Sequence, residues 1–296
     1  MQNKYENQYS YLIDETVDRR TSKNPEVSAI IVTYNRPRIF LDCLASLENQ
    51  SYKNFEIIVV DNGGNDSIKE KILQYNLLYL KMKENTPVLL ARTVGCFYSR
   101  SSYGGFIDDD AICDIHIIKN AIETFKSFPE IVAASGRILP RSNVIYNKLQ
   151  SHYDLGNKIL FGHYREGNSF IKKEAWLELS FYSNCVFDRK LIKGHEGMIV
   201  IYKIGKKYGI KSFIYQPSII IYHDYASNLK NFLKKKRSHK KAIENYSKNF
   251  PEIINFVKKE YHPDIATSCV TKKSVSDKIL IRLINFFLKI FLKLRL

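Results

Sequence analysis

Short apolar runs that each end in polar residues recur along the first third of this 296-residue chain. Val27–Thr33 and Phe55–Val60 are rich in β-branched residues, as expected of strands buried on both faces. Apolar residues at helical spacing separate them, from Ile39 to Leu47. This alternation predicts an α/β fold: a mostly parallel sheet with helices on both faces.

Polar residues follow three of the expected strands. They are Thr33–Arg36, Asp61 and Asp108–Asp110. Ligands of such sheets bind at the carboxyl ends of the strands, so these residues predict a site there. The three adjacent carboxylates repel one another, and a divalent cation, Mg²⁺ or Mn²⁺, relieves that repulsion. A solvated acidic loop is the alternative reading of this triplet.

Four ordered segments resemble the successive signatures of glycosyltransferase family 2. They are VSAIIVTYNR (27–36), FEIIVVDNG (55–63), ARTVG (91–95) and FIDDDA (106–111). The resemblance covers roughly residues 25–225. It implies a GT-A fold, which is Rossmann-like, and an inverting, metal-dependent transferase that uses a nucleotide-sugar donor. Residues 25–112 would form the nucleotide-binding half and residues 113–225 the acceptor half.

The resemblance also implies roles for individual residues. The positions expected to contact the nucleotide are Thr33, Tyr34, Asn35, Arg36, Asp61, Arg92, Asp108 and Asp109. Asp61 would accept a hydrogen bond from the base, usually uracil, and Arg92 would neutralise nucleotide charge or contact the base. Asp108 and Asp110 match the ends of an Asp-x-Asp motif and would hold the metal. His223 would be a further metal ligand or a phosphate contact, with a purely structural role as the alternative.

The expected acceptor-side Glu-Asp pair is replaced here by Gly194-His195-Glu196-Gly197. We expect Glu196 to be the general base, and His195 is the second candidate. Glu196 could also favour the start of the helix expected at 197–208 through the helix dipole, and the two roles are compatible. Two more departures from the family pattern are Thr93, where Asn is usual, and Pro87, where Gly is common.

Most of the net charge of +16 lies near the C-terminus. Residues 229–296 hold 17 Lys and Arg against 5 Asp and Glu, a net charge of +12. Within the basic helical extension expected at 226–296, residues 276–296 predict an amphipathic helix with a Lys/Arg stripe. Its apolar runs are shorter than the ~20 residues that span a bilayer, so we expect it to lie on an anionic membrane surface. Packing on the body or on another subunit is the alternative.

The remaining sequence features favour a peripheral location at the inner face of the cytoplasmic membrane. Residues 1–24 are expected to form an irregular leader without a secretory signal, and the scattered cysteines match no metal or redox motif. The expected acceptor is a glycan or lipid-linked hydroxyl in bacterial surface polysaccharide biosynthesis.

A catalytically impaired sugar-nucleotide-binding protein is one rival to the transferase hypothesis. A nucleic-acid-binding protein using the basic tail is another, but no nucleic-acid module accompanies that charge. The oligomeric state is left open, with a dimer among the options.

Overall fold

The fold comes from a computed structural model that describes residues 8–65, 68–72, 74–148, 154–179, 196–261, 279 and 282–283. Within these residues, ten strands form one sheet. The strands are β1 (Ile13–Asp18), β2 (Val27–Thr33), β3 (Phe55–Asp61), β4 (Leu77–Met82), β5 (Tyr103–Asp108), β6 (Ile112–Cys113), β7 (Ala133–Leu139), β8 (Leu160–Phe161), β9 (Asn168–Lys172) and β10 (Phe213–Tyr222).

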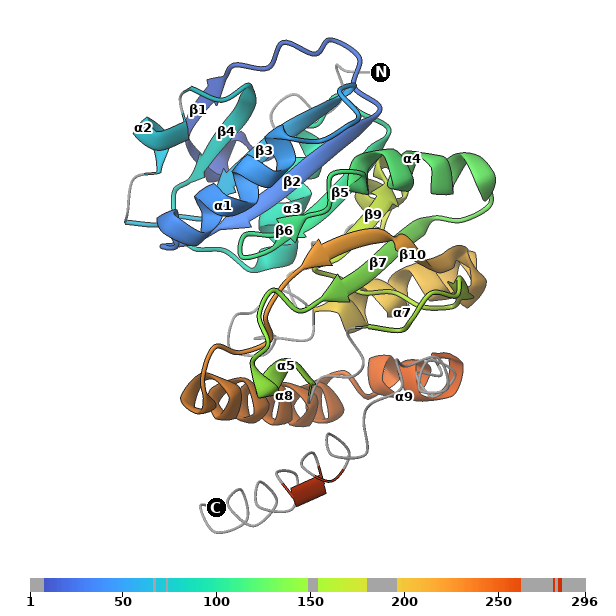
Figure 1. Cartoon of the computed structure of the whole chain (residues 1–296). Coiled ribbons are helices and arrows are strands. Elements are labelled where there is room, and N and C mark those ends of the chain that lie inside the picture. The colour runs from blue at the N-terminus through green and yellow to red at the C-terminus, as the bar shows by residue number, and fades with distance from the viewer. Residues whose placement is uncertain are drawn as a thin grey trace.

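The sheet is mixed and runs in the order β1-β4-β3-β2-β5-β9-β7-β10-β6, with β8 pairing β10 (Figure 1). Strands β4, β3, β2 and β5 are parallel, as the alternating pattern predicts. Strand β9 then inserts antiparallel between β5 and β7. The register sets Thr33 beside Asp61 and Val32 beside Asp108, so the polar residues that follow β2, β3 and β5 meet at one edge.

Helices cover both faces of the sheet, which confirms the expected fold class. The helices are α1 (Pro37–Glu48), α2 (Lys69–Ile72), α3 (Val88–Phe97), α4 (Ile117–Ser127), α5 (Ile145–Lys148), α6 (Lys173–Glu178), α7 (Gly197–Tyr208), α8 (Leu229–Asn249) and α9 (Pro251–Glu260). One apolar cluster joins the sheet to α1 and α4. A second cluster joins the other face to α3, α6, α7 and α9.

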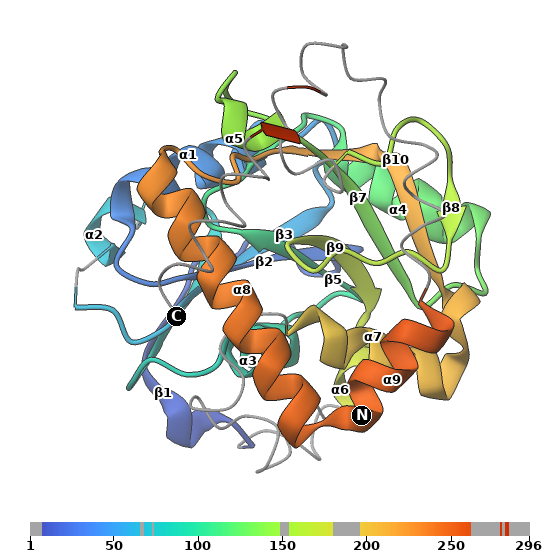
Figure 2. The ribbon, with the colours of Figure 1, turned by 90° about the horizontal axis from the view of Figure 1, so that it is seen from below.

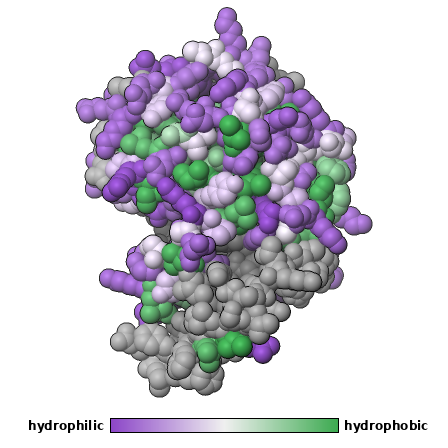
Figure 3. Space-filling model, viewed as in Figure 1, coloured by the Kyte–Doolittle hydropathy of each residue, from purple (hydrophilic) through white to green (hydrophobic). Residues whose placement is uncertain are grey.

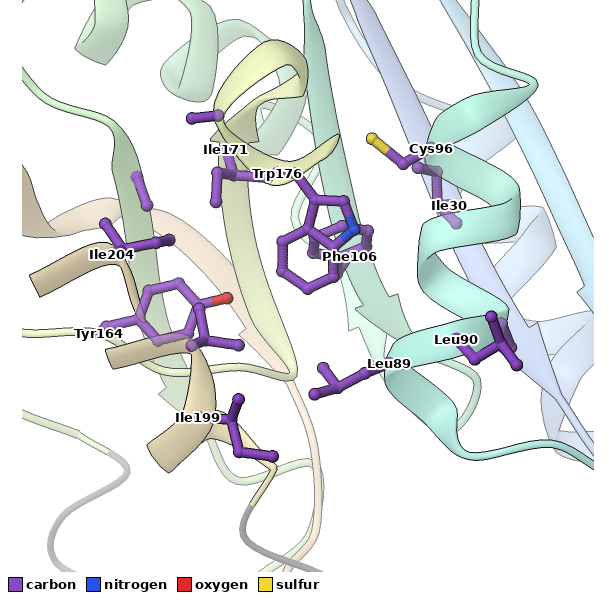
Figure 4. Close-up of a cluster of buried hydrophobic side chains, with 14 of the residues drawn as sticks. Ile30, Leu89, Leu90, Cys96, Phe106, Tyr164, Ile171, Trp176, Ile199 and Ile204 are labelled. Atoms are coloured by element: carbon purple, nitrogen blue, oxygen red, sulfur yellow. The ribbon is translucent and has the colours of Figure 1, made fainter. Parts of the chain in front are cut away.

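The second cluster ties the two halves of the sheet together (Figure 4). Phe106 of β5 packs on Trp176 of α6 with ring centroids 4.4 Å apart, and both side chains are fully buried. The Trp176 indole N–H donates to the Thr93 hydroxyl at 3.0 Å. The family departure at Thr93 therefore satisfies a buried donor that would otherwise cost stability.

The leader expected to be irregular proves partly ordered. Strand β1 pairs antiparallel with β4 along five register positions, so the prediction for residues 1–24 is wrong at 13–18. The burial of β1 alternates between half-buried and exposed side chains. Such an edge strand lacks the continuous apolar run by which the other strands were recognised.

The region after Tyr225 contains two helices that pack against the body. In the view from below, α8 crosses in front of the sheet and α9 lies beside α7 (Figure 2). The amphipathic helix expected at 276–296 lies outside the described residues except for Ile279, Arg282 and Leu283. In the described ranges, no helix is both long enough and apolar enough to cross a membrane. The face drawn in Figure 3 carries hydrophobic side chains in scattered patches among hydrophilic ones.

Candidate functional site

A cleft of 900 Å³ opens where β2 and β5 end. Its walls come from segments far apart in the sequence: the ends of β2 and β5, the loop before α3, the residue before α7, the end of β10, and α8. The polar residues that line it are Thr33, Tyr34, Arg36, Asn62, Asn85, Thr86, Arg92, Asp108, Asp109, Asp110, Glu196, His223 and Lys235. Most of the residues predicted from the sequence therefore meet in one cavity.

The three carboxylates of the Asp triplet alternate in exposure. The side chains of Asp108 and Asp110 are 41% and 28% exposed, whereas that of Asp109 is 9% exposed. Asp109 turns into the protein, where it accepts hydrogen bonds from Thr33 Oγ1 at 2.9 Å and Arg36 Nη1 at 3.2 Å. Burial raises the pKa of Asp109 to about 6, against the opposing effect of Arg36. The outer two carboxylates thus face the cleft, and the middle one holds the loop after β2.

Asp110 and His223 form a pair on the cleft wall. His223 Nε2 lies 3.0 Å from Asp110 Oδ1. Burial alone would raise the pKa of Asp110, but the hydrogen bond and charge of His223, together with Arg36, bring that pKa down to about 2. The same pairing raises the pKa of His223 in spite of its burial. His223 is fixed from behind because its backbone N–H donates to the Leu139 carbonyl at 2.8 Å.

Arg92 forms ion pairs with two acidic residues, Asp108 and Glu166. It projects from α3, is 5% exposed, and donates from Nη2 to Asp108 Oδ1 at 3.0 Å. Its Nη1 forms a second ion pair with Glu166. Burial raises the pKa of Glu166, while Arg92 and the backbone N–H of Gly197 oppose that rise. Arg92 therefore lines the cleft while paired with two carboxylates, and its contact with the nucleotide stays a prediction.

Sequence reasoning missed Glu166. It lies in a stretch rich in Tyr, Gly and His, a composition typical of loops, and its neighbour Gly167 precedes β9. A Cβ on Gly167 would lie only 2.0 Å from Asp108 Oδ2, so this glycine lets the 166–168 segment pass close to the Asp triplet. No local pattern around Glu166 signals burial, because its partner Arg92 is 74 residues away in the chain.

Glu196 lines the cleft directly before the first turn of α7. Its charge acts on Arg92 and Glu166, so it belongs to the same charged cluster as these two residues. The location suits both roles considered from the sequence, a general base and a helix-start residue. His195, the second candidate base, lies outside the described residues.

Asp61 and Asn35 shape the loops next to the cleft and are not among its lining residues in the described part of the chain. Asp61 is 2% exposed and accepts hydrogen bonds from Tyr79 Oη at 2.9 Å and from the Gly64 N–H at 3.1 Å. Asn35 has a φ of 52°, and its Oδ1 accepts from the Asn65 N–H at 2.8 Å. Asp61 is thus buried and holds the turn at Gly64, and its hydrogen bond to the base stays a prediction.

The cleft also has the donor chemistry for a divalent cation. In the described ranges, no three His, Cys, Asp or Glu side chains form a complete metal-binding group. Asp108 and Asp110 nevertheless offer carboxylate oxygens, and His223 offers an imidazole nitrogen next to Asp110. Mg²⁺ and Mn²⁺ sites commonly use one or two protein carboxylates and complete their coordination with substrate phosphates and water. These residues therefore fit a cation that binds together with a phosphorylated substrate.

Comparison with known proteins adds independent information. The model of the family "Glycosyl transferase family 2" matches residues 28–193. Glycosyltransferase GlyA of Streptococcus pneumoniae is 31% identical over 90 residues, which cover 29% of this chain and 13% of GlyA. Glycosyltransferase AglE of Haloferax volcanii is 33% identical over 103 residues, covering 32% of this chain and 33% of AglE. The chain thus matches only a minor part of these relatives' length.

Two solved structures share the fold. S. aureus TarS 1–349 in complex with UDP-GlcNAc has a TM-score of 0.51 and 16% identity, over 67% of this chain and 58% of that one. The mannosyltransferase PcManGT from Pyrobaculum calidifontis, in complex with GDP-Man and Mn²⁺, has a TM-score of 0.52 and 15% identity. That match covers 93% of this chain and 83% of PcManGT, so it extends beyond the region of the family model.

Proposed function

Because this chain belongs to glycosyl transferase family 2, we propose that it moves a sugar from a nucleoside-diphosphate donor to an acceptor hydroxyl with inversion at the anomeric carbon. The donor base is uracil and the cofactor is Mn²⁺ or Mg²⁺. The observation that carries this proposal is the convergence of Asp108, Asp110, Arg92, Glu196 and His223 on one cleft.

The donor side of the cleft is assigned to the Asp triplet and the loop after β2. Thr33 and Arg36 are fixed through Asp109, and Tyr34 is 43% exposed at the cleft, where a base can stack on its ring. Asp108 and Asp110 face the cavity, and together with His223 they would hold the cation. The cation, when bound, neutralises the diphosphate charge that grows as the glycosidic bond breaks.

The acceptor side is assigned to Glu196. An acceptor hydroxyl attacks the anomeric carbon from the face opposite the leaving diphosphate, and Glu196 takes its proton. Arg92 and Glu166 position this residue, because the N–H of Gly197, the next residue, hydrogen-bonds to Glu166. The bond between the anomeric carbon and the diphosphate oxygen breaks, and the electron pair leaves with the diphosphate.

The acceptor is proposed to be a glycan or lipid-linked saccharide of a bacterial surface polysaccharide. The names of the relatives that match support glycosyl transfer in general, and the basic region after Tyr225 supports a peripheral place on the inner face of the cytoplasmic membrane. An anionic lipid surface would attract that charge.

The decisive experiment is a turnover assay with a panel of UDP- and GDP-sugars, with and without Mn²⁺. We expect hydrolysis or transfer of one UDP-sugar that stops when EDTA is added. Asp110→Asn should abolish the Mn²⁺ dependence and lower turnover by about 10²-fold or more, as loss of a key charge-stabilising group does. The matched control is Asp114→Asn, at a half-buried carboxylate outside the described cleft lining. Wild-type protein that binds sugar nucleotides but turns none over would instead support the impaired, binding-only rival.

A further inference from the structure

Lys235 of α8 reaches the donor cleft from outside the region matched by the family model. It also lines a second cavity of 510 Å³ that adjoins the first along Arg36, Asp110 and His223. A lysine on a basic surface helix is normally fully solvated. Lys235 is half-buried and acts electrostatically on Asp108 and Asp110.

The fold holds this ammonium group in place. Its Nζ lies 5.0 Å from the centre of the Tyr225 ring, a distance that allows a cation–π contact. Tyr225 is 1% exposed, and its N–H donates to Asn147 Oδ1 at 2.8 Å. The Phe232 ring, fully buried one turn before Lys235, packs edge-on against Tyr225. Helix α8 is therefore anchored beside the cleft on the face that carries Lys235.

The charge of Lys235 has no close acidic partner in the described structure. Arg92 and Arg36 each pair with two carboxylates, whereas Lys235 forms no ion pair within 4 Å among the described residues. Burial lowers its pKa, and the nearby Asp110 and Asp108 oppose that shift. A half-buried cation that lines the cleft and lacks an ion-pair partner among the described residues is positioned for an anionic ligand.

We propose that Lys235 is a catalytic residue that contacts the diphosphate of the donor and stabilises it as a leaving group. The inference rests on the proposed function and adds a second source of positive charge beside the cation. When the bond from the anomeric carbon to the diphosphate oxygen breaks, the electron pair moves onto that oxygen and the diphosphate gains one negative charge. The acceptor oxygen forms the new bond, and its proton goes to Glu196. Lys235 is neither consumed nor deprotonated.

The test is calorimetric binding of UDP and of uridine to the full chain with Mn²⁺ present. Lys235→Met should weaken UDP binding by about 10- to 100-fold, the usual effect of losing a hydrogen bond to a charged group. Uridine binding should stay within about twofold, because the nucleoside lacks the diphosphate. Lys235→Arg should recover a large part of the UDP affinity, because it keeps the positive charge. If the Lys235→Met protein does not fold, Lys235→Gln takes its place in the measurement.

Two lysines of the same helix serve as controls. Lys236 contacts the same Tyr225 ring but is not among the described residues lining either cavity, and Lys241 is exposed. Lys236→Met and Lys241→Met should bind UDP like wild type. Equal UDP affinity in Lys235→Met and wild type overturns the role of Lys235 and leaves the proposed function standing. Equal losses for UDP and uridine also overturn it, because they indicate a structural effect. Wild type that does not bind UDP refutes the proposed function and the role of Lys235 together.

Discussion

Gly167→Ala is predicted to damage catalysis far more than folding. An added Cβ would lie 2.0 Å from Asp108 Oδ2 and 2.7 Å from its Cγ. Carbon and oxygen atoms in contact normally stay about 3.3 Å apart, so the carboxylate must retreat by roughly 1.3 Å. That movement lengthens the 3.0 Å contact with Arg92 beyond hydrogen-bonding distance.

The consequence for activity follows from the position of Asp108 on the donor side. A misplacement of about 1 Å in a catalytic group can cost on the order of 10²-fold in rate. Stability should change by less than about 1.5 kcal/mol, because the Asp108 side chain is 41% exposed and can rotate into the cleft. We therefore expect kcat/KM to fall by about 10²-fold while the melting temperature moves by only a few degrees.

The assay is steady-state kinetics with the active sugar nucleotide, accompanied by thermal melting. Gly104→Ala is the matched control, since it lies on the same strand as Asp108 and its Cβ would meet Cys96 Sγ and Ile30 Cδ1 at an ordinary 3.5 Å. The control should keep both activity and stability. A Gly167→Ala enzyme with wild-type kinetics would refute the assignment of Asp108 to the reaction, and a loss of stability matching the loss of activity would refute the argument from geometry.

Two further predictions concern stability. Arg92→Met leaves Asp108 and buried Glu166 without their cation. The free energy of unfolding, measured with urea, should therefore fall by about 3 to 5 kcal/mol. A fall below about 1 kcal/mol would contradict the paired arrangement. Burial lowers the pKa of His163, 2% exposed, from 6.5 to about 4, so the unfolded chain takes up this proton first as the pH falls. The contribution of this group to the free energy of unfolding is present above pH 6.5 and should decline by up to about 3 kcal/mol towards pH 4. His163→Phe should remove that part of the decline. Denaturation curves measured between pH 4 and pH 7 would show the difference.

The sequence predicted the parallel half of the sheet well because its strands are buried on both faces. Val27–Thr33 is an almost continuous apolar run, and the structure buries six of its seven residues. The Asp triplet and Thr33 could be placed together because parallel strands end at the same edge. Strand β1 was missed for the opposite reason: it lies at the edge, and its polar residues resemble a loop.

Lys235, which lines the cleft, and Glu166, which pairs with Arg92, could not be found from local patterns. Lys235 belongs to a run of four basic residues, and such a run normally predicts a solvated face. Packing of α8, which includes the contact of Phe232 with Tyr225, brings one of these lysines to the cleft. Glu166 is likewise positioned by Arg92 from a distant helix. Chemistry that depends on long-range packing leaves no periodicity in the sequence.

Arg92 connects the parts that sequence reasoning treated separately. It binds Asp108 on the donor side through one nitrogen and Glu166 through the other. Glu166 in turn accepts the N–H of Gly197, which follows Glu196. Two ion pairs and one backbone hydrogen bond therefore link the donor-side carboxylate to the start of α7. Because removing one partner of a buried ion pair costs several kcal/mol, we expect this linkage to restrain the position of Glu196, the proposed base.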